Sequence, residues 1–332
     1  MNCFDNSLII SFVSSLSKFG FAPSLAFGLE SDTQVTLSYM KQTSDDRPDY
    51  GIPWLNGKPV PVSRQNFYGF DSDFLETDAD IFTVDIIHQF NDSVSLNALT
   101  RYANYERESR ITEALITESI ATGASLADTS IYRNVFIGNS EETLFATQAT
   151  ITWELETGSI EHVIAGGLDF SREKSNPTFA FGIGALGTSL LNPNSQMSFT
   201  GSTDPRVVSD TTGETSAFYI LDTIKINDNW QLTLGGRWDK FDTDYDAERF
   251  KGPATPFNSG SVDGKESFNR VDKEGSYRTA LVYKPTLESS IYLAGSTSFN
   301  PSAQGLSLLT SGRGLGLGNP VSYTHLTLPT KA

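Results

Sequence analysis

Apolar and polar residues alternate along much of this chain, most clearly from Ala79 to Glu106. Two alternating arms flank the polar tripeptide Asn91-Asp92-Ser93. One face of the first arm carries Phe82, Val84, Ile86, His88 and Phe90. The matching face of the second arm carries Val94, Leu96, Ala98, Thr100 and Tyr102. A period of two predicts strands, and a polar turn between them predicts a β-hairpin.

The length of these arms is the first indication of function. Each is about ten or more residues long, roughly twice the usual strand of a globular protein. At about 3.3 Å per residue and a tilt near 45°, ten residues rise about 23 Å, close to the apolar band of an outer-membrane barrel. The arms are therefore long enough to cross a membrane as strands.

The same hairpin unit recurs along the chain and predicts about ten strands. Short turns lie at residues 30–32, 91–93, 157–159, 227–229 and 286–288. Long polar segments, expected to be loops, lie at residues 42–78, 107–142, 173–213 and 242–274. Barrels of the outer membrane alternate short periplasmic turns with long extracellular loops, whereas a β-sandwich has no reason to do so. The chain is therefore predicted to be all-β, an antiparallel transmembrane β-barrel present in part.

Aromatic residues next to the short turns support this prediction. Phe90, Trp153 and Trp230 lie where a barrel has its interfacial girdle. The alternative is that aromatic residues simply favour strands.

Composition narrows the function classes. A hydrophobic content of 38% is low for a packed soluble core but suits a barrel with a wet interior. The formal net charge of −16 argues against nucleic acid as a partner. Cys3 is the only cysteine, which excludes disulfides within the chain and thiolate metal sites. No run approaches the roughly 20 apolar residues of a membrane helix.

Four motifs carry a family resemblance. They are Ala22-Pro23-Ser24-Leu25-Ala26-Phe27-Gly28-Leu29, Arg47-Pro48-Asp49-Tyr50-Gly51-Ile52-Pro53-Trp54-Leu55, Asn66-Phe67-Tyr68-Gly69 and Ser298-Phe299-Asn300-Pro301-Ser302-Ala303. Together and in this order they resemble the barrel of TonB-dependent siderophore receptors, especially the catecholate type. The resemblance implies a 22-stranded barrel in the bacterial outer membrane. It also implies an N-terminal plug and import of ferric siderophores with energy from the TonB complex.

The resemblance divides the chain into three parts. Residues 20–310 are expected to be a partial receptor barrel. Residues 1–19 contain an apolar run but only Asp5 as a charge before it, so they fit neither a secretory signal nor the receptor. Residues 311–332 combine a Gly-rich stretch with a tail resembling translated sequencing adapter. We expect an interior fragment that lacks the plug, which would contact TonB, and the C-terminal strands.

The resemblance implies a ferric siderophore and outer-membrane lipid as partners. A ferric catecholate is a bulky anion with aromatic rings, so guanidinium groups and stacking surfaces would hold it. The residues of the long loops that offer these groups are Arg47, Trp54, Arg64, Asn66, Tyr68, Phe179 and Phe181. The alternative for Trp54 is that it only packs the loop on its neighbours. No catalytic residue, metal ligand or cofactor is expected, because iron would arrive inside its chelator.

Two other functions fit parts of the pattern. A passive porin shares the strand and loop pattern but has no plug. A soluble or surface-anchored β-sandwich, such as an adhesin or a glycan-active protein, would bury its apolar faces against a second sheet.

Overall fold

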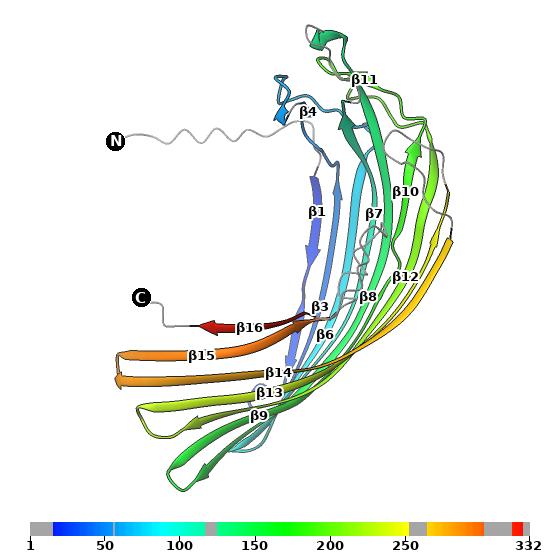
Figure 1. Ribbon diagram of the computed structural model, residues 1–332. Helices are drawn as coiled ribbons and strands as arrows, with labels where there is room; N and C mark the ends of the chain where they lie inside the picture. Colours follow the sequence, from blue (N-terminus) through cyan, green and yellow to red (C-terminus); the bar gives the residue numbers. More distant parts are fainter. Residues whose placement is uncertain (1–15, 56, 117–124, 252–263, 302–320, 328–332) are drawn as a thin grey trace, which may run out of the picture.

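The computed structural model describes residues 16–55, 57–116, 125–251, 264–301 and 321–327. One curved antiparallel sheet of 14 strands contains nearly all of it, and β4 and β5 form a separate two-stranded sheet (Figure 1). The long strands are β3 (Thr33–Asp46), β6 (Phe74–Asn91), β7 (Val94–Leu115), β8 (Ser130–Thr157), β9 (Ile160–Ser175), β12 (Ser202–Lys225), β13 (Trp230–Arg249), β14 (Gly264–Thr286) and β15 (Ser289–Asn300). The short strands are β1 (Leu16–Phe21), β2 (Ser24–Phe27), β4 (Trp54–Leu55), β5 (Lys58–Pro59), β10 (Thr178–Ile183), β11 (Thr188–Ser189) and β16 (Val321–Thr327).

Chain neighbours are also neighbours in the sheet. The order is β1-β3-β6-β7-β8-β10-β12-β13-β14-β15-β16, with β2 on β3, β11 on β8, and β9 between β8 and β12. The described part of the chain has one helix, the 3₁₀ turn η1 (Leu126–Asp128). No helix in that part is long and apolar enough to cross a membrane. The strand order and the curvature of the one large antiparallel sheet make the architecture a partial β-barrel, as predicted.

All ten predicted strands are present, and four short strands join them in the large sheet. Of these four, β1 continues the sheet to Leu16, and β16 pairs with β15 from Val321 to Thr327. Both lie wholly or partly in residues 1–19 and 311–332, the two end segments that the sequence sets apart from the receptor barrel. That division of the chain stays a prediction.

The alternation of turn and loop length is confirmed. Only residues 92–93 separate β6 from β7, and only residues 158–159 separate β8 from β9. Figure 1 shows the hairpin turns β8–β9, β12–β13 and β14–β15 together at one end of the sheet, while β4 and β11 lie at the other end. This asymmetry is the one that outer-membrane barrels show.

The predicted bounds of the four long loops are wrong. The strands run far into them, so the connections between long strands shrink to residues 47–73, 116–129, 176–201 and 250–263. The third connection also contains β10 and β11. The physical reason is that water bathes both faces of a strand beyond the lipid. No apolar alternation is then required there, and periodicity cannot reveal the strand.

The apolar residues form one continuous outward face. Register places Phe82 opposite Tyr102 and Tyr102 opposite Phe145. Further along, Leu168 lies opposite Phe218. Phe82, Tyr102, Leu168 and Phe218 are 45%, 51%, 66% and 55% exposed, so no second sheet covers them. A β-sandwich is thereby excluded, and lipid is the environment that such a face requires.

Aromatic girdles and charges mark the edges of this face. Near the short turns, the rings of Trp230 and Tyr283 stack at 4.4 Å between centroids, as the predicted girdle requires. At the opposite edge, Phe218 stacks on Trp238 at 5.6 Å. Beyond that edge, outward positions carry ion pairs, including Arg172 with Glu214 at 3.3 Å. Charged groups are costly in hydrocarbon, so these pairs mark where the lipid band ends.

The adjacent residues Ile86 and Ile87 of β6 test which face meets lipid. Ile86 belongs to the outward row at mid-height, and Ile87 lies on the opposite face. For the protein inserted in a bacterial outer membrane, Ile86→Arg should lower the free energy of unfolding by about 2–4 kcal/mol. Ile87→Arg should change it little. Urea titration followed by heat-modifiable electrophoretic mobility measures both. Equal losses for the two variants would contradict this assignment of faces.

Candidate functional site

Four aromatic rings gather at the end of the sheet that carries the long loops. Phe136 of β8 lies opposite Phe181 of β10, and their ring centroids are 5.7 Å apart. Phe179 lies 6.1 Å from Phe136 and 5.0 Å from Phe181. Tyr50 stacks on Phe136 at 6.5 Å and is 58% exposed. The cluster thus offers an accessible stacking surface.

A guanidinium group adjoins this aromatic cluster. Arg206 lies over the ring of Phe181 at 5.2 Å and forms an ion pair with Asp204 at 2.5 Å. Phe136 lies on the same face of β8 as Gln148, because the two residues are an even number of positions apart and the register with β7 is unbroken. The cluster therefore continues the concave face of the sheet. An aromatic ligand could stack on these rings, whereas the guanidinium of Arg206 is buried and its charge is balanced by Asp204.

The structure brings Phe179 and Phe181 together but gives other predicted binding residues structural partners. The Asn66 side chain donates to the Leu191 carbonyl at 3.3 Å, and the Tyr68 hydroxyl donates to the Leu190 carbonyl at 2.7 Å. Arg47 forms an ion pair with Asp71 at 2.6 Å. Asn66, Tyr68 and Arg47 thus hold the first long loop in shape.

Trp54 and Arg64 remain open to solvent. Trp54 lies in β4 and is 66% exposed, and Arg64 is exposed in the loop after β5. The indole ring is therefore not packed in the loop, although Trp54 pairs with Pro59 in the two-stranded sheet of this loop, and a ligand contact by Trp54 stays a prediction. The packing of the loop comes from Ile52 and Leu55 against a buried cluster of Val60, Tyr68, Ile131 and Leu190.

Burial changes the titration of two groups in this loop. Desolvation raises the pKa of the Asp73 carboxyl, although a hydrogen bond from the Phe70 amide at 3.0 Å opposes the shift. Desolvation also raises the pKa of the Tyr68 phenol, against a hydrogen bond from Asn66. Both groups are buried, so the loop is packed as firmly as a small core.

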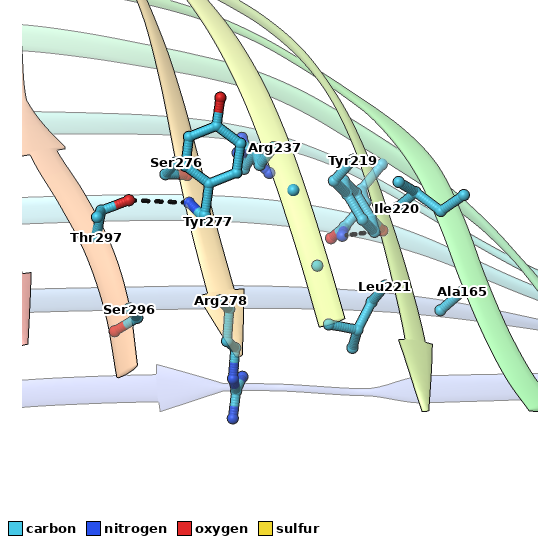
Figure 2. Close-up of a pocket in the computed structure, with 13 residues that line it drawn as sticks. Ala165, Tyr219, Ile220, Leu221, Arg237, Ser276, Tyr277, Arg278, Ser296 and Thr297 are labelled. Atoms are coloured by element: carbon cyan, nitrogen blue, oxygen red, sulfur yellow. Dashed lines mark hydrogen bonds between the residues drawn. The ribbon is translucent and has the colours of Figure 1, made fainter. Parts of the chain in front are cut away.

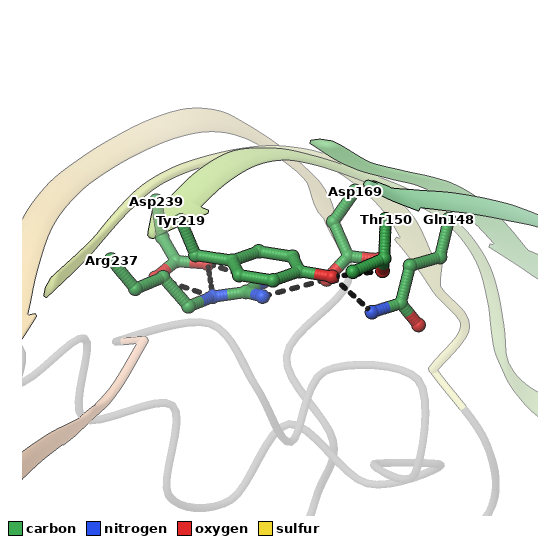
Figure 3. A network of polar contacts seen from close by, with 6 residues as sticks. All are labelled: Gln148, Thr150, Asp169, Tyr219, Arg237 and Asp239. Carbon is green, nitrogen blue, oxygen red and sulfur yellow. Dashed lines mark hydrogen bonds and ion pairs between the residues drawn. The ribbon is translucent and has the colours of Figure 1, made fainter. Parts of the chain in front are cut away.

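Closer to the short turns, the concave face of the sheet carries a network of polar side chains (Figure 3). Arg237 donates to Asp239 at 2.9 Å and to Asp169 at 2.6 Å. The Tyr219 hydroxyl accepts a hydrogen bond from the Gln148 amide at 2.9 Å and bonds to the Thr150 hydroxyl. Strands β8, β9, β12 and β13 each contribute, so the network ties four strands together on the wet side.

Glycines shape the wall around this network. A Cβ on Gly167 would lie 2.5 Å from the Tyr219 ring and 2.6 Å from the Ala149 carbonyl oxygen, so only glycine leaves room for the ring. A Cβ on Gly235 would lie 2.5 Å from Leu221 Cδ1. Gly235 borders a pocket of about 420 Å³, which Arg237, Arg278 and Tyr219 also line (Figure 2). This side of the sheet is polar and indented, in contrast to the outward face.

No group of three or more His, Cys, Asp and Glu side chains is placed to hold a metal ion in the described ranges. The aromatic cluster of Tyr50, Phe136, Phe179 and Phe181 supports recognition of an aromatic ligand.

A family model decides the identity of the fold. The TonB dependent receptor-like beta-barrel model matches residues 20–325. The chain belongs to this family. TonB-dependent receptors are transporters rather than enzymes and lie in the outer membrane, which sets this chain apart from a passive porin.

Curated relatives agree with this assignment. The probable TonB-dependent siderophore receptor PiuA of Acinetobacter baumannii is 27% identical over 85% of this chain and 39% of its own length. The probable TonB-dependent receptor BfrD of Bordetella pertussis is 30% identical over 86% of this chain and 40% of its own. The catecholate siderophore receptor Fiu of Escherichia coli K12 is 27% identical over 69% and 32%. The chain thus spans about two fifths or less of these relatives.

Solved receptor structures share the fold. The crystal structure of PiuA superposes with a TM-score of 0.77 at 24% identity, covering 95% of this chain and 47% of that one. The closed form of Fiu superposes with a TM-score of 0.78 at 22% identity, covering 90% and 46%. This sheet is therefore similar to about half of a TonB-dependent receptor barrel.

Sequence reasoning missed several members of the site. Tyr50 belongs to a motif that carries the family resemblance, but nothing in the sequence indicates its contact with Phe136. Phe136 lies in a segment that was expected to be a loop. The contact between Tyr219 and Gly167 depends on strand register, although the Gly166-Gly167 pair within an alternating arm was a signal for a close approach.

The two adjacent glycines of β9 test the wall of this TonB-dependent receptor barrel. Gly167→Ala should lower the free energy of unfolding by about 1–3 kcal/mol, because the added methyl meets the Tyr219 ring and a backbone oxygen. Gly166→Ala is the matched control, since its Cβ would meet only the Tyr219 carbonyl oxygen at 3.7 Å. Denaturant titration in detergent compares them. A Gly167→Ala variant as stable as the control would contradict the packing described.

Proposed function

We propose that this chain is part of an outer-membrane receptor that imports ferric siderophores of the catecholate type, with energy from TonB. The main support is the match of residues 20–325 to the receptor barrel family. PiuA and Fiu, which this chain resembles, are named as siderophore receptors, and Fiu as a catecholate receptor. The chain covers less than half of either relative, so the plug and the TonB contact would come from the remainder of the protein.

The aromatic cluster supports the catecholate class. A ferric catecholate presents flat rings and net negative charge. Tyr50, Phe136, Phe179 and Phe181 offer ring faces beside the guanidinium of Arg206. Ring stacking adds about 0.5–1.5 kcal/mol per pair beyond the area buried, so several rings together select an aromatic chelate over an aliphatic one.

The exposed residues of the first long loop extend this proposed site. Trp54 is 66% exposed and Arg64 is exposed, so both are free to meet a ligand that enters from the loop side. Asn66 and Tyr68 stabilise this loop through hydrogen bonds to the carbonyls of Leu191 and Leu190, respectively. We therefore assign direct contact to Trp54, Arg64, Phe179 and Phe181, and a supporting role to Asn66 and Tyr68.

Removal of the two phenyl rings of β10 tests the proposal. In the complete receptor, expressed in cells without other catecholate receptors, Phe179→Ala with Phe181→Ala should raise the dissociation constant for a radio-iron catecholate about tenfold. The loss arises because two stacking surfaces disappear. Cells without TonB should bind the same complex but not accumulate iron.

Phe145→Ala with Phe218→Ala is the matched control, because both rings lie on the outward face. It should leave the dissociation constant unchanged. Binding and uptake equal to those of receptor-free cells, for every catecholate tried, would rule out the proposed function.

A further inference from the structure

Arg133 of β8 is the largest side chain in the described residues that is completely buried, with 0% exposure. It lies on the face of β8 opposite Phe136, since an odd number of positions separates the two residues. A buried cation is costly unless hydrogen bonds replace its water. The nearby carboxylates form ion pairs with other arginines, Asp73 with Arg110 and Asp71 with Arg47, and Asp73 acts on Arg133 only through space.

Two loops supply the groups that replace water around Arg133. Its Nε donates to the Tyr68 carbonyl at 2.7 Å, in the loop between β3 and β6. Its Nη2 donates to the Asn194 carbonyl at 2.8 Å, in the loop between β11 and β12. Its guanidinium also lies over the Phe70 ring at 4.3 Å, and Nη1 lies 3.4 Å from Met197 Sδ.

The same two loops also bond to each other around Arg133. The Asp71 amide donates to the Met197 carbonyl at 2.9 Å, and the Phe199 amide donates to the Ser72 hydroxyl at 2.9 Å. The rings of Phe70 and Phe199 meet at 5.5 Å. The guanidinium therefore sits at the junction of both loops and β8. If either loop withdraws, a buried charge loses a partner, and the other loop is weakened too.

We propose that Arg133 is a positioning residue that makes the loops at residues 60–73 and 186–200 dock on β8 as one unit. Its planar fork places two separate nitrogens, Nε and Nη2, against carbonyls of the two loops, whereas a lysine has all its donors on one nitrogen. The first loop follows the exposed Trp54 and contains the exposed Arg64, and the second loop follows Phe179 and Phe181 of β10. The consequence for ligand affinity rests on the proposed function, whereas the coupling of the loops does not.

Hydrogen exchange of the full receptor in detergent tests the coupling directly. Arg133→Met should raise amide exchange in residues 60–73 and in residues 186–200 by the same factor, about tenfold or more. Exchange in the β6–β7 hairpin should stay unchanged. Arg101→Met is the matched control, because Arg101 is exposed and far from both loops in the register. It should alter neither loop.

Arg133→Lys keeps the positive charge but removes the planar guanidinium group. Its amide exchange should therefore match that of Arg133→Met. A rise in only one loop, no rise in either, or normal exchange for Arg133→Lys would overturn the proposal. Should Arg133→Met fail to reach the membrane, Arg133→Lys and Phe70→Leu carry the same test, with both loops again expected to loosen together.

Uptake kinetics provide a second measurement on cells. Arg133→Met should raise the half-saturating concentration of a radio-iron catecholate about tenfold with little change in the maximum rate. A fall in the maximum rate alone would indicate fewer folded receptors and would overturn a positioning role. Absence of catecholate uptake by the unmodified receptor would defeat the proposed function, while the exchange experiment would still decide the coupling.

Discussion

Two requirements of the lipid environment govern this structure. Every backbone group inside hydrocarbon must form a hydrogen bond, and every side chain that faces the lipid must be apolar. A slip of one residue in any strand pair would turn its apolar row toward water and its polar row toward lipid. The strand register from β3 to β14 is the result: it shifts beside the β6–β7 turn and between β10 and β12, and it is continuous in the other pairings of the long strands. It carries Tyr39, Phe82, Tyr102 and Phe145 at directly paired positions across four strands. The polar network of Tyr219 and Arg237 occupies the other face.

Beyond the lipid band the constraint is lifted, and the features that suit recognition lie there. Strands continue with polar residues on both faces, and β8 reaches 28 residues in length. Loops pack on them with small buried clusters of their own, around Tyr68 and Ile131. A buried arginine is tolerated because two loop carbonyls solvate it. Aromatic rings gather on the concave side, where no lipid competes for them. The membrane thus determines the lower part of the sheet and leaves the upper part free to specialise.

The sequence was sufficient for the parts that lipid controls. Alternation around Asn91-Asp92-Ser93 predicted the β6–β7 hairpin and the face that each residue occupies. Alternation is absent where both faces of a strand contact water. The first residues of β8 and β12 were therefore wrongly predicted to belong to loops. The roles of Asn66 and Tyr68 could not be predicted either. A polar side chain looks the same in a sequence whether it meets a ligand or a carbonyl of a loop more than 120 residues away. The pairing of Tyr50 with Phe136 likewise depends on how a loop crosses two strands.

The central claim is that the outward apolar face meets hydrocarbon, and tryptophan quenching by lipids with brominated acyl chains tests it most directly. Three single-tryptophan versions of the protein retain Trp153, Trp238 or Trp54, with phenylalanine at the other tryptophan positions. Trp153 and Trp238 lie on the outward face, and Trp54 lies on the first long loop. The account predicts strong quenching of Trp153 and Trp238 and little quenching of Trp54. Quenching of Trp54 as strong as that of the other two, or no quenching of Trp153 and Trp238, would contradict it.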